Sequence, residues 1–135
     1  MQLSDSTRTW IGILIITIPT VQYGGYFLLR ILMGRAAVKS EVQRSYFRAG
    51  HAHAGVLILL ALTAQLVVES TSLSSSLQML VRIGFAAAPI LIPIGFFGGA
   101  PSEGSQPKPL VRAIYVGAII LALSAVTLAL GLIFR

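Results

Sequence analysis

The sequence predicts an all-α integral membrane protein, a four-helix transmembrane bundle with both termini on the non-cytoplasmic side. Of its 135 residues, 56% are hydrophobic and only 10% are charged, whereas soluble domains carry about 25% charged residues. The charges fall between long apolar runs, as in polytopic membrane proteins. The chain is expected to be a single domain, residues 1–135, with spans at about 10–32, 46–68, 77–97 and 110–134.

The first span contains both a predicted kink and a face of small and polar residues. Pro19 interrupts the apolar run, and a proline inside a helix removes a hydrogen bond and bends it. The second half of the span reads Gln22, Tyr23, Gly24, Gly25 and Tyr26. Such a face is expected to meet a neighbouring helix or a ligand, because lipid offers no hydrogen-bond partners.

The other three spans are separated by polar segments. A basic connection with Arg30, Arg35, Lys39 and Arg44 precedes the second span, and a turn rich in serine and threonine follows it. In the third span Arg82 is expected to snorkel toward the membrane surface, and Pro89 and Pro93 predict kinks. Gly95 and Gly99 have the spacing of a helix-packing pair, and a turn-rich loop at 100–109 leads into the last span.

The distribution of basic residues predicts the orientation of the chain and excludes nucleic acid as a partner. The first and third connections are basic and the second is not, so the two basic connections are expected in the cytoplasm and both termini outside. The formal net charge of +6 is explained by this arrangement and leaves no basic stripe for phosphates. The expected location is a bacterial inner membrane.

Both histidines of the chain lie early in the second span, in Arg48-Ala-Gly-His51-Ala-His53-Ala-Gly55. Ionisable side chains at that depth are costly and usually functional. On a helix the two rings point about 200° apart, so one helix cannot offer both to one metal ion. The chain has no cysteine, which excludes thiolate ligands and covalent haem attachment.

Haem b matches this combination of residues. A histidine can supply an axial bond to iron, the small residues around His51, including Gly55, leave room for a macrocycle, and Arg44 or Arg48 can pair with propionates. The alternative is that the two histidines simply form hydrogen bonds with neighbouring helices.

Two patches resemble the styrene oxide isomerases. The run from Arg48 to Gly55 is similar to the Arg-Ala-His segment on the second helix of that family, and Ile94-Gly-Phe-Phe-Gly-Gly-Ala-Pro101 is similar to its Phe-rich helix end. The resemblance implies a homotrimer with haem b at subunit interfaces. Ferric iron would act as a Lewis acid that converts a small hydrophobic aryl epoxide to an aldehyde through a 1,2-hydride shift.

Carried over to this chain, the axial ligand falls on His51 or His53, and the small polar stripe beside His51 favours that residue. Candidates for the substrate-facing tyrosine of the family are Tyr23, Tyr26, Tyr46 and Tyr115. The family's asparagine, six residues after its ligand, corresponds to Leu57 or Leu59. Haem binding therefore carries over better than epoxide isomerisation.

Two other functions fit the sequence. A small transporter or channel would couple to protons through an acidic group in the membrane, and Glu69 is the only acidic candidate near a span. A structural subunit of a membrane complex would use the small-residue faces for assembly.

Overall fold

The structure, a computed structural model, describes residues 2–38 and 40–134, so that Met1, Lys39 and Arg135 lie outside the described residues. All regular structure in the described part is helical. The elements are α1 (Asp5–Ile16), α2 (Ile18–Leu32), α3 (Glu41–Val67), η1 (Val68–Ser70), α4 (Ser75–Gly99), η2 (Pro109–Val111) and α5 (Arg112–Ile133).

Four helical stretches are long and apolar enough to cross a membrane, which confirms the number of predicted spans. They are Asp5–Leu32, Glu41–Ser70, Ser75–Gly99 and Pro109–Ile133. The helices begin before the apolar runs because serine caps them: Ser4, Ser40 and Ser74 each accept a hydrogen bond from a backbone N–H three residues on. Arg44 therefore lies in the first turn of α3 and not in the connection that precedes it.

The predicted kink in the first span is a break between α1 and α2. The break falls at Thr17, and Pro19 lies in the first turn of α2, where its missing N–H costs least. The hydroxyl of Thr17 donates to the carbonyl of Leu14 at 2.6 Å. By contrast, α4 continues through Pro89 and Pro93.

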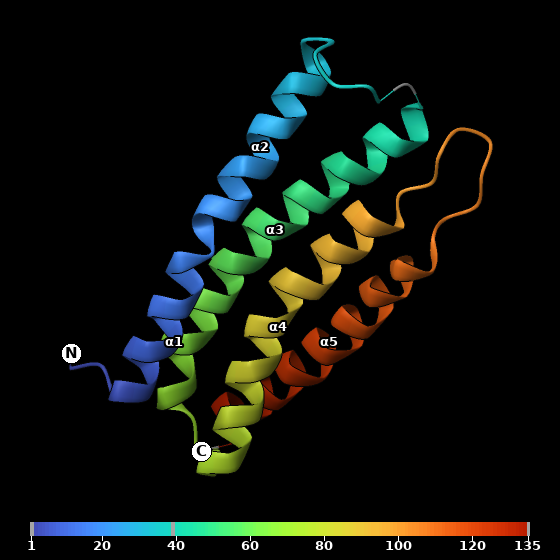
Figure 1. Ribbon diagram of the computed structural model, residues 1–135. Coiled ribbons are helices and arrows are strands. Elements are labelled where there is room, and N and C mark those ends of the chain that lie inside the picture. The colour runs from blue at the N-terminus through green and yellow to red at the C-terminus, as the bar shows by residue number, and fades with distance from the viewer. Residues whose placement is uncertain (1, 39, 135) are drawn as a thin grey trace.

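The spans run up and down in sequence order, and the order in space follows the chain. α5 packs along α4, α4 packs along α3, and α1 and α2 meet α3 on the side away from α5 (Figure 1). The start of α1 and the end of α5 lie at one end of the molecule, together with the turn between α3 and α4 (Figure 1). The connections from α2 to α3 and from α4 to α5 lie at the other end.

Glycines bring α4 and α5 into close contact, as the spacing of Gly95 and Gly99 predicts. A Cβ atom on Gly95 would lie 2.7 Å from the backbone nitrogen of Ile114, and one on Gly99 would lie 2.8 Å from Cα of Val111. Both distances are shorter than a van der Waals contact, so only glycine allows the two backbones to approach this closely.

The buried core lies along α3 and α4, whereas the outer helices are mostly exposed. Among the described residues α2 has no buried side chain, and α5 buries only Gly117, Ser124 and Gly131. Their exposed surfaces are rich in isoleucine, leucine and valine, the composition expected where helices face lipid or another copy of the chain.

Candidate functional site

The two histidines lie on opposite borders of the buried face of α3, as their spacing predicts. His51 faces α2, and His53 lies on an exposed part of the helix beside Phe96 of α4. His51 and His53 are roughly 15 and 18 Å along α3 from Glu41, because a helix rises 1.5 Å per residue. The two histidines therefore have different surroundings.

The ring of His51 rests against the backbone of α2. A Cβ atom on Gly24 would lie 3.2 Å from His51 Nδ1, and one on Gly25 would lie 3.3 Å from His51 Cε1. The two glycines thus make the space that the imidazole fills. Nδ1 is buried and has no hydrogen-bond partner among the described residues, an arrangement that costs free energy unless a ligand supplies the partner.

His51 also lines an apolar groove with a volume of about 590 Å³. Pockets for small ligands typically have volumes of this size, with few polar groups. The groove lies between the α1–α2 segment, α3 and α4, and its walls include Trp10, Gly24, Ala54, Ile83 and Phe97. No charged residue lines it within the described part of the chain.

His53 has a different geometry. Its Nδ1 lies 2.7 Å from the carbonyl oxygen of Ala49, one turn earlier on α3. A carbonyl oxygen only accepts, so this contact requires a proton on Nδ1, and in the neutral ring Nε2 then keeps its lone pair. The ring packs on Phe96 with 5.0 Å between ring centroids. Histidines that bind metals commonly have this arrangement, with the other ring N–H donated to a carbonyl.

The remaining residues proposed for haem binding are only partly gathered around either histidine. Arg44 donates to the carbonyl of Val38 at 3.1 Å and pairs with Glu41, and Arg48 pairs with the same carboxylate at 2.8 Å. Gly55 has open space beside it. The space beside Gly50 is not free, because a Cβ atom there would lie 2.9 Å from the Phe97 ring.

None of the candidate tyrosines lines the groove. Tyr23, Tyr26 and Tyr115 are largely exposed on the outer surfaces of α2 and α5. The rings of Tyr23 and Tyr26 lie 6.4 Å apart and flank the glycine pair that holds His51. Tyr46 lies closer to a histidine, since it packs edge-on against Phe96, the ring that also contacts His53.

Leu57 and Leu59, the two residues that the resemblance would align with the asparagine of the isomerases, are placed differently from each other. Leu57 is buried in a small core cluster with Ala88 and Ile92. Leu59 is exposed on the outer surface of α3. Neither side chain can donate or accept a hydrogen bond.

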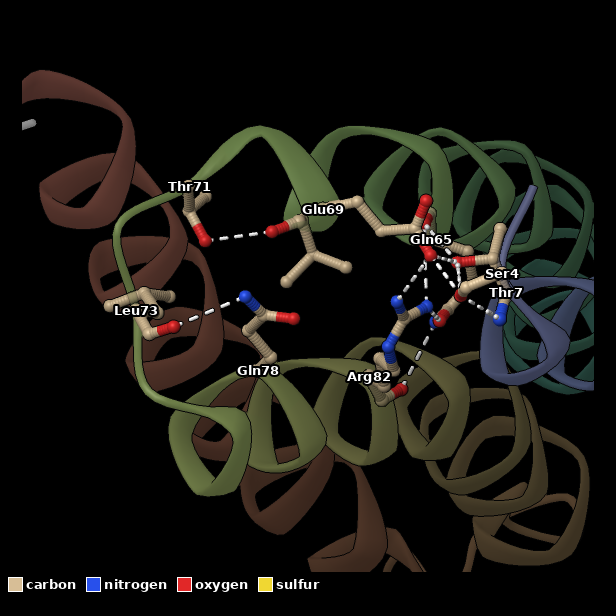
Figure 2. Close-up of polar contacts among 9 residues, drawn as sticks. Ser4, Thr7, Gln65, Glu69, Thr71, Leu73, Gln78 and Arg82 are labelled. Atoms are coloured by element: carbon tan, nitrogen blue, oxygen red, sulfur yellow. Dashed lines mark hydrogen bonds and ion pairs between the residues drawn. The ribbon is translucent and has the colours of Figure 1, made fainter. Parts of the chain in front are cut away.

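A polar cluster joins α1, α3 and α4 (Figure 2). It lies beside the turn between α3 and α4, at the opposite end of the molecule from the connections α2–α3 and α4–α5 (Figure 1). Arg82 is buried and turns inward, which overturns the expectation that it snorkels. Its guanidinium donates to Gln65 Oε1 at 3.0 Å and lies 3.4 Å from a carboxylate oxygen of Glu69. Ser4 and Thr7 of the α1 end donate to the same carboxylate. Glu69 therefore holds α1 in place.

Among the described residues, no three histidine or acidic side chains come together as they would around a metal ion. A metal held by the chain alone is not supported by this arrangement, whereas a haem needs only one or two protein ligands. Comparison of the chain with protein families, with curated proteins and with solved structures found no match.

Three contacts at these sites have no signal in the sequence. The small face at Gly24 and Gly25 predicts a helix or ligand contact but not that His51 fills it, and nothing in the sequence links Phe96 to His53. The third contact is between Gly99 of α4 and Val111, the residue before Arg112. Because Gly99 lies one turn of α4 beyond Phe96, this contact brings Arg112, the first residue of α5, toward the His53 side of α4. Each of these contacts joins two different helices, so spacing within one helix carries no signal for it.

Proposed function

We propose that the protein is an integral membrane protein that binds haem b, with His53 of α3 as an axial ligand. The observation that carries the proposal is the hydrogen bond from His53 Nδ1 to the carbonyl of Ala49, at 2.7 Å, on an exposed face of a membrane-crossing helix. It fixes the tautomer and leaves Nε2 available as a ligand.

The exposure of His53 supports a site shared with another copy of the chain. A polar ring roughly 18 Å along a 27-residue helix falls within the hydrocarbon region of a bilayer about 30 Å thick. Contact with lipid would leave Nε2 without a partner, at a cost in free energy. A haem between subunits removes that cost, and the resemblance to the isomerases favours a trimer.

The neighbours of His53 suit a flat ligand. Ala52 and Val56 are exposed and lie within one turn of His53, so no large polar side chain of α3 covers the ring. Arg112 is exposed at the cytoplasmic end expected for α5 and offers a cation for a propionate. Arg44 and Arg48 lie on the His51 side of α3, already paired with Glu41.

Isomerisation of aryl epoxides is the activity that the resemblance suggests for such a site. Ferric haem would supply a Lewis acid for the epoxide oxygen. The chain itself contributes an apolar outer face, with Leu59 in place of the asparagine of the family. This face keeps water from the substrate, and orienting the epoxide would depend on its shape because Leu59 makes no hydrogen bond.

The absorption spectrum of the protein purified in mild detergent tests the proposal. We expect a Soret band that is lost in His53→Ala and retained in His51→Ala, the matched variant two residues away. A colourless protein, even after haem is added, would exclude haem binding and leave the transporter and structural-subunit hypotheses. Loss of the band in His51→Ala alone would show that the ligand is His51.

The activity is tested separately, with styrene oxide as substrate and phenylacetaldehyde as product. We expect conversion by the ferric protein and suppression by dithionite, because reduction weakens the Lewis acidity of the iron. A coloured protein without conversion in the ferric state would leave haem binding intact and exclude this isomerase activity.

A further inference from the structure

The groove beside His51 lies on the other side of α3 from His53 and is independent of the proposed haem site. We propose that it binds a lipid-soluble molecule with an elongated hydrocarbon body and a single hydroxyl group, an alcohol or a phenol, whose hydroxyl meets the His51 imidazole.

Two walls of the groove give the same length. It runs from Trp10 to Gly24 on the α1–α2 segment and from Ile83 to Phe97 on α4. Each of these stretches covers 14 residue steps, which is roughly 21 Å of helix. A volume of about 590 Å³ spread over this length means that the groove is long and narrow. It suits one hydrocarbon chain better than a compact ligand.

The polarity of the groove is concentrated at one end. The hydroxyls of Thr17 and Thr20 also line it, but each donates to a carbonyl of its own helix at 2.6 Å. His51 Nδ1 is left as the buried polar atom without a partner; α2 covers it at Gly24, so the ring has to turn toward the groove for Nδ1 to meet a ligand. A hydroxyl both donates and accepts, so it can pair with the imidazole in either tautomer. A charged head group has no counter-ion among the described lining residues, and its burial would be costly.

The groove opens to the side, toward the position of the bilayer. Ile13, Ile83, Ile90 and Ile94 line it and are each about half exposed. An occupant can therefore enter from the hydrocarbon region without crossing a polar loop. The carbon chain would extend along Ala54 and Ile58 to Trp10, at the end of the groove opposite His51.

Trp10 provides the measurement, because it is the only tryptophan of the chain. The probe is para-dodecylphenol with bromine on the last carbon of its tail, added to the full-length protein in nanodiscs. If the hydroxyl lies at His51, the bromine lies near Trp10 and quenches its fluorescence. We expect saturable quenching at low mole fractions of probe, beyond the linear quenching produced by probe dissolved in the lipid.

Two comparisons identify the hydroxyl as the group that is recognised. His51→Ala should weaken binding of the phenol about tenfold, the loss of one buried hydrogen bond, whereas His53→Ala should leave it unchanged. The matched probe without the hydroxyl, dodecylbenzene brominated at the same carbon, should bind equally to the native protein and to His51→Ala.

Filling the groove with Ala87→Phe should abolish saturable quenching by both probes, with circular dichroism confirming that the variant is folded. If both probes bind the native protein equally, the groove accepts any hydrocarbon chain and the proposal is wrong. Absence of saturable quenching would also overturn it. A Soret band that survives in His51→Ala while quenching is lost would separate this site from the haem site.

Discussion

Glycines have opposite roles at the two contacts that join α5 and α2 to the central helices α4 and α3. Between α4 and α5 they remove side chains so that backbones meet, as at Gly95 and Ile114. Between α2 and α3 they make room for a side chain, the imidazole of His51. The first contact buries apolar surface and determines stability, whereas the second leaves a groove and an unpaired nitrogen. The loosely packed half is therefore the half that holds the groove.

The largest effect is expected at the close contact between α4 and α5. Gly95→Leu places a side chain where a Cβ atom alone would lie 2.7 Å from a backbone nitrogen, which cannot move without shifting α5. We expect a loss of about 3 kcal/mol of stability, measured by reversible unfolding in mixed micelles. Gly12→Leu on α1 is the matched control, since nothing lies within 4 Å of its Cβ position. Equal losses in the two variants would show that α4 and α5 are not held as described.

A smaller effect is expected where the polar cluster attaches α1. Arg82→Met leaves Gln65 and Glu69 without their cation, and breaking a buried ion pair costs about 3–5 kcal/mol. The side chain of Glu69 is 29% exposed, so water reduces the cost, and we expect about 2 kcal/mol.

Hydrogen exchange locates this effect. In Arg82→Met the amides of α1 and of the adjoining ends of α3 and α4 should exchange faster while those of α5 are unchanged, because the cluster joins α1, α3 and α4 and includes no residue of α5. Glu69→Gln in the same background should speed the exchange of α1 further, because it removes the carboxylate charge to which Ser4 and Thr7 still donate after Arg82 is gone. Faster exchange throughout the protein would mean that Arg82 stabilises the whole fold and does not specifically attach α1.

The features that the sequence predicted are those encoded within one helix. The number of spans follows from hydropathy, the opposite directions of His51 and His53 follow from their spacing, and the packing of Gly95 and Gly99 follows from small residues four apart. The orientation in the membrane and the haem site stay predictions. They depend on interactions with lipid and with a ligand, and contacts between the helices do not test them.

The features that the sequence did not predict depend on contacts between helices. Arg82 is a reasonable snorkelling residue until Gln65 and Glu69, 17 and 13 residues away, are placed beside it. Likewise, part of the room expected among the small residues around His51 is taken, because Phe97 from α4 fills the space beside Gly50. The spacing of residues within a helix predicts the direction of a side chain, but it does not predict which residues of other helices that side chain contacts.

The smallest effect tests the histidine contact itself. Gly24→Ala would place Cβ 3.2 Å from His51 Nδ1, and the imidazole can move by a few tenths of an ångström into the groove. Alanine also favours the helix over glycine by roughly 0.5–1 kcal/mol, so we expect stability within about 0.5 kcal/mol of the native protein. Gly117→Ala is the matched substitution between α4 and α5, where Cβ would lie 2.7 Å from Ile92 Cγ1 and 3.3 Å from its backbone nitrogen. It should cost more than Gly24→Ala in the same unfolding assay. If Gly24→Ala were the more destabilising of the two, the α2–α3 contact would be as rigid as the α4–α5 contact, and the groove could not adjust to a ligand.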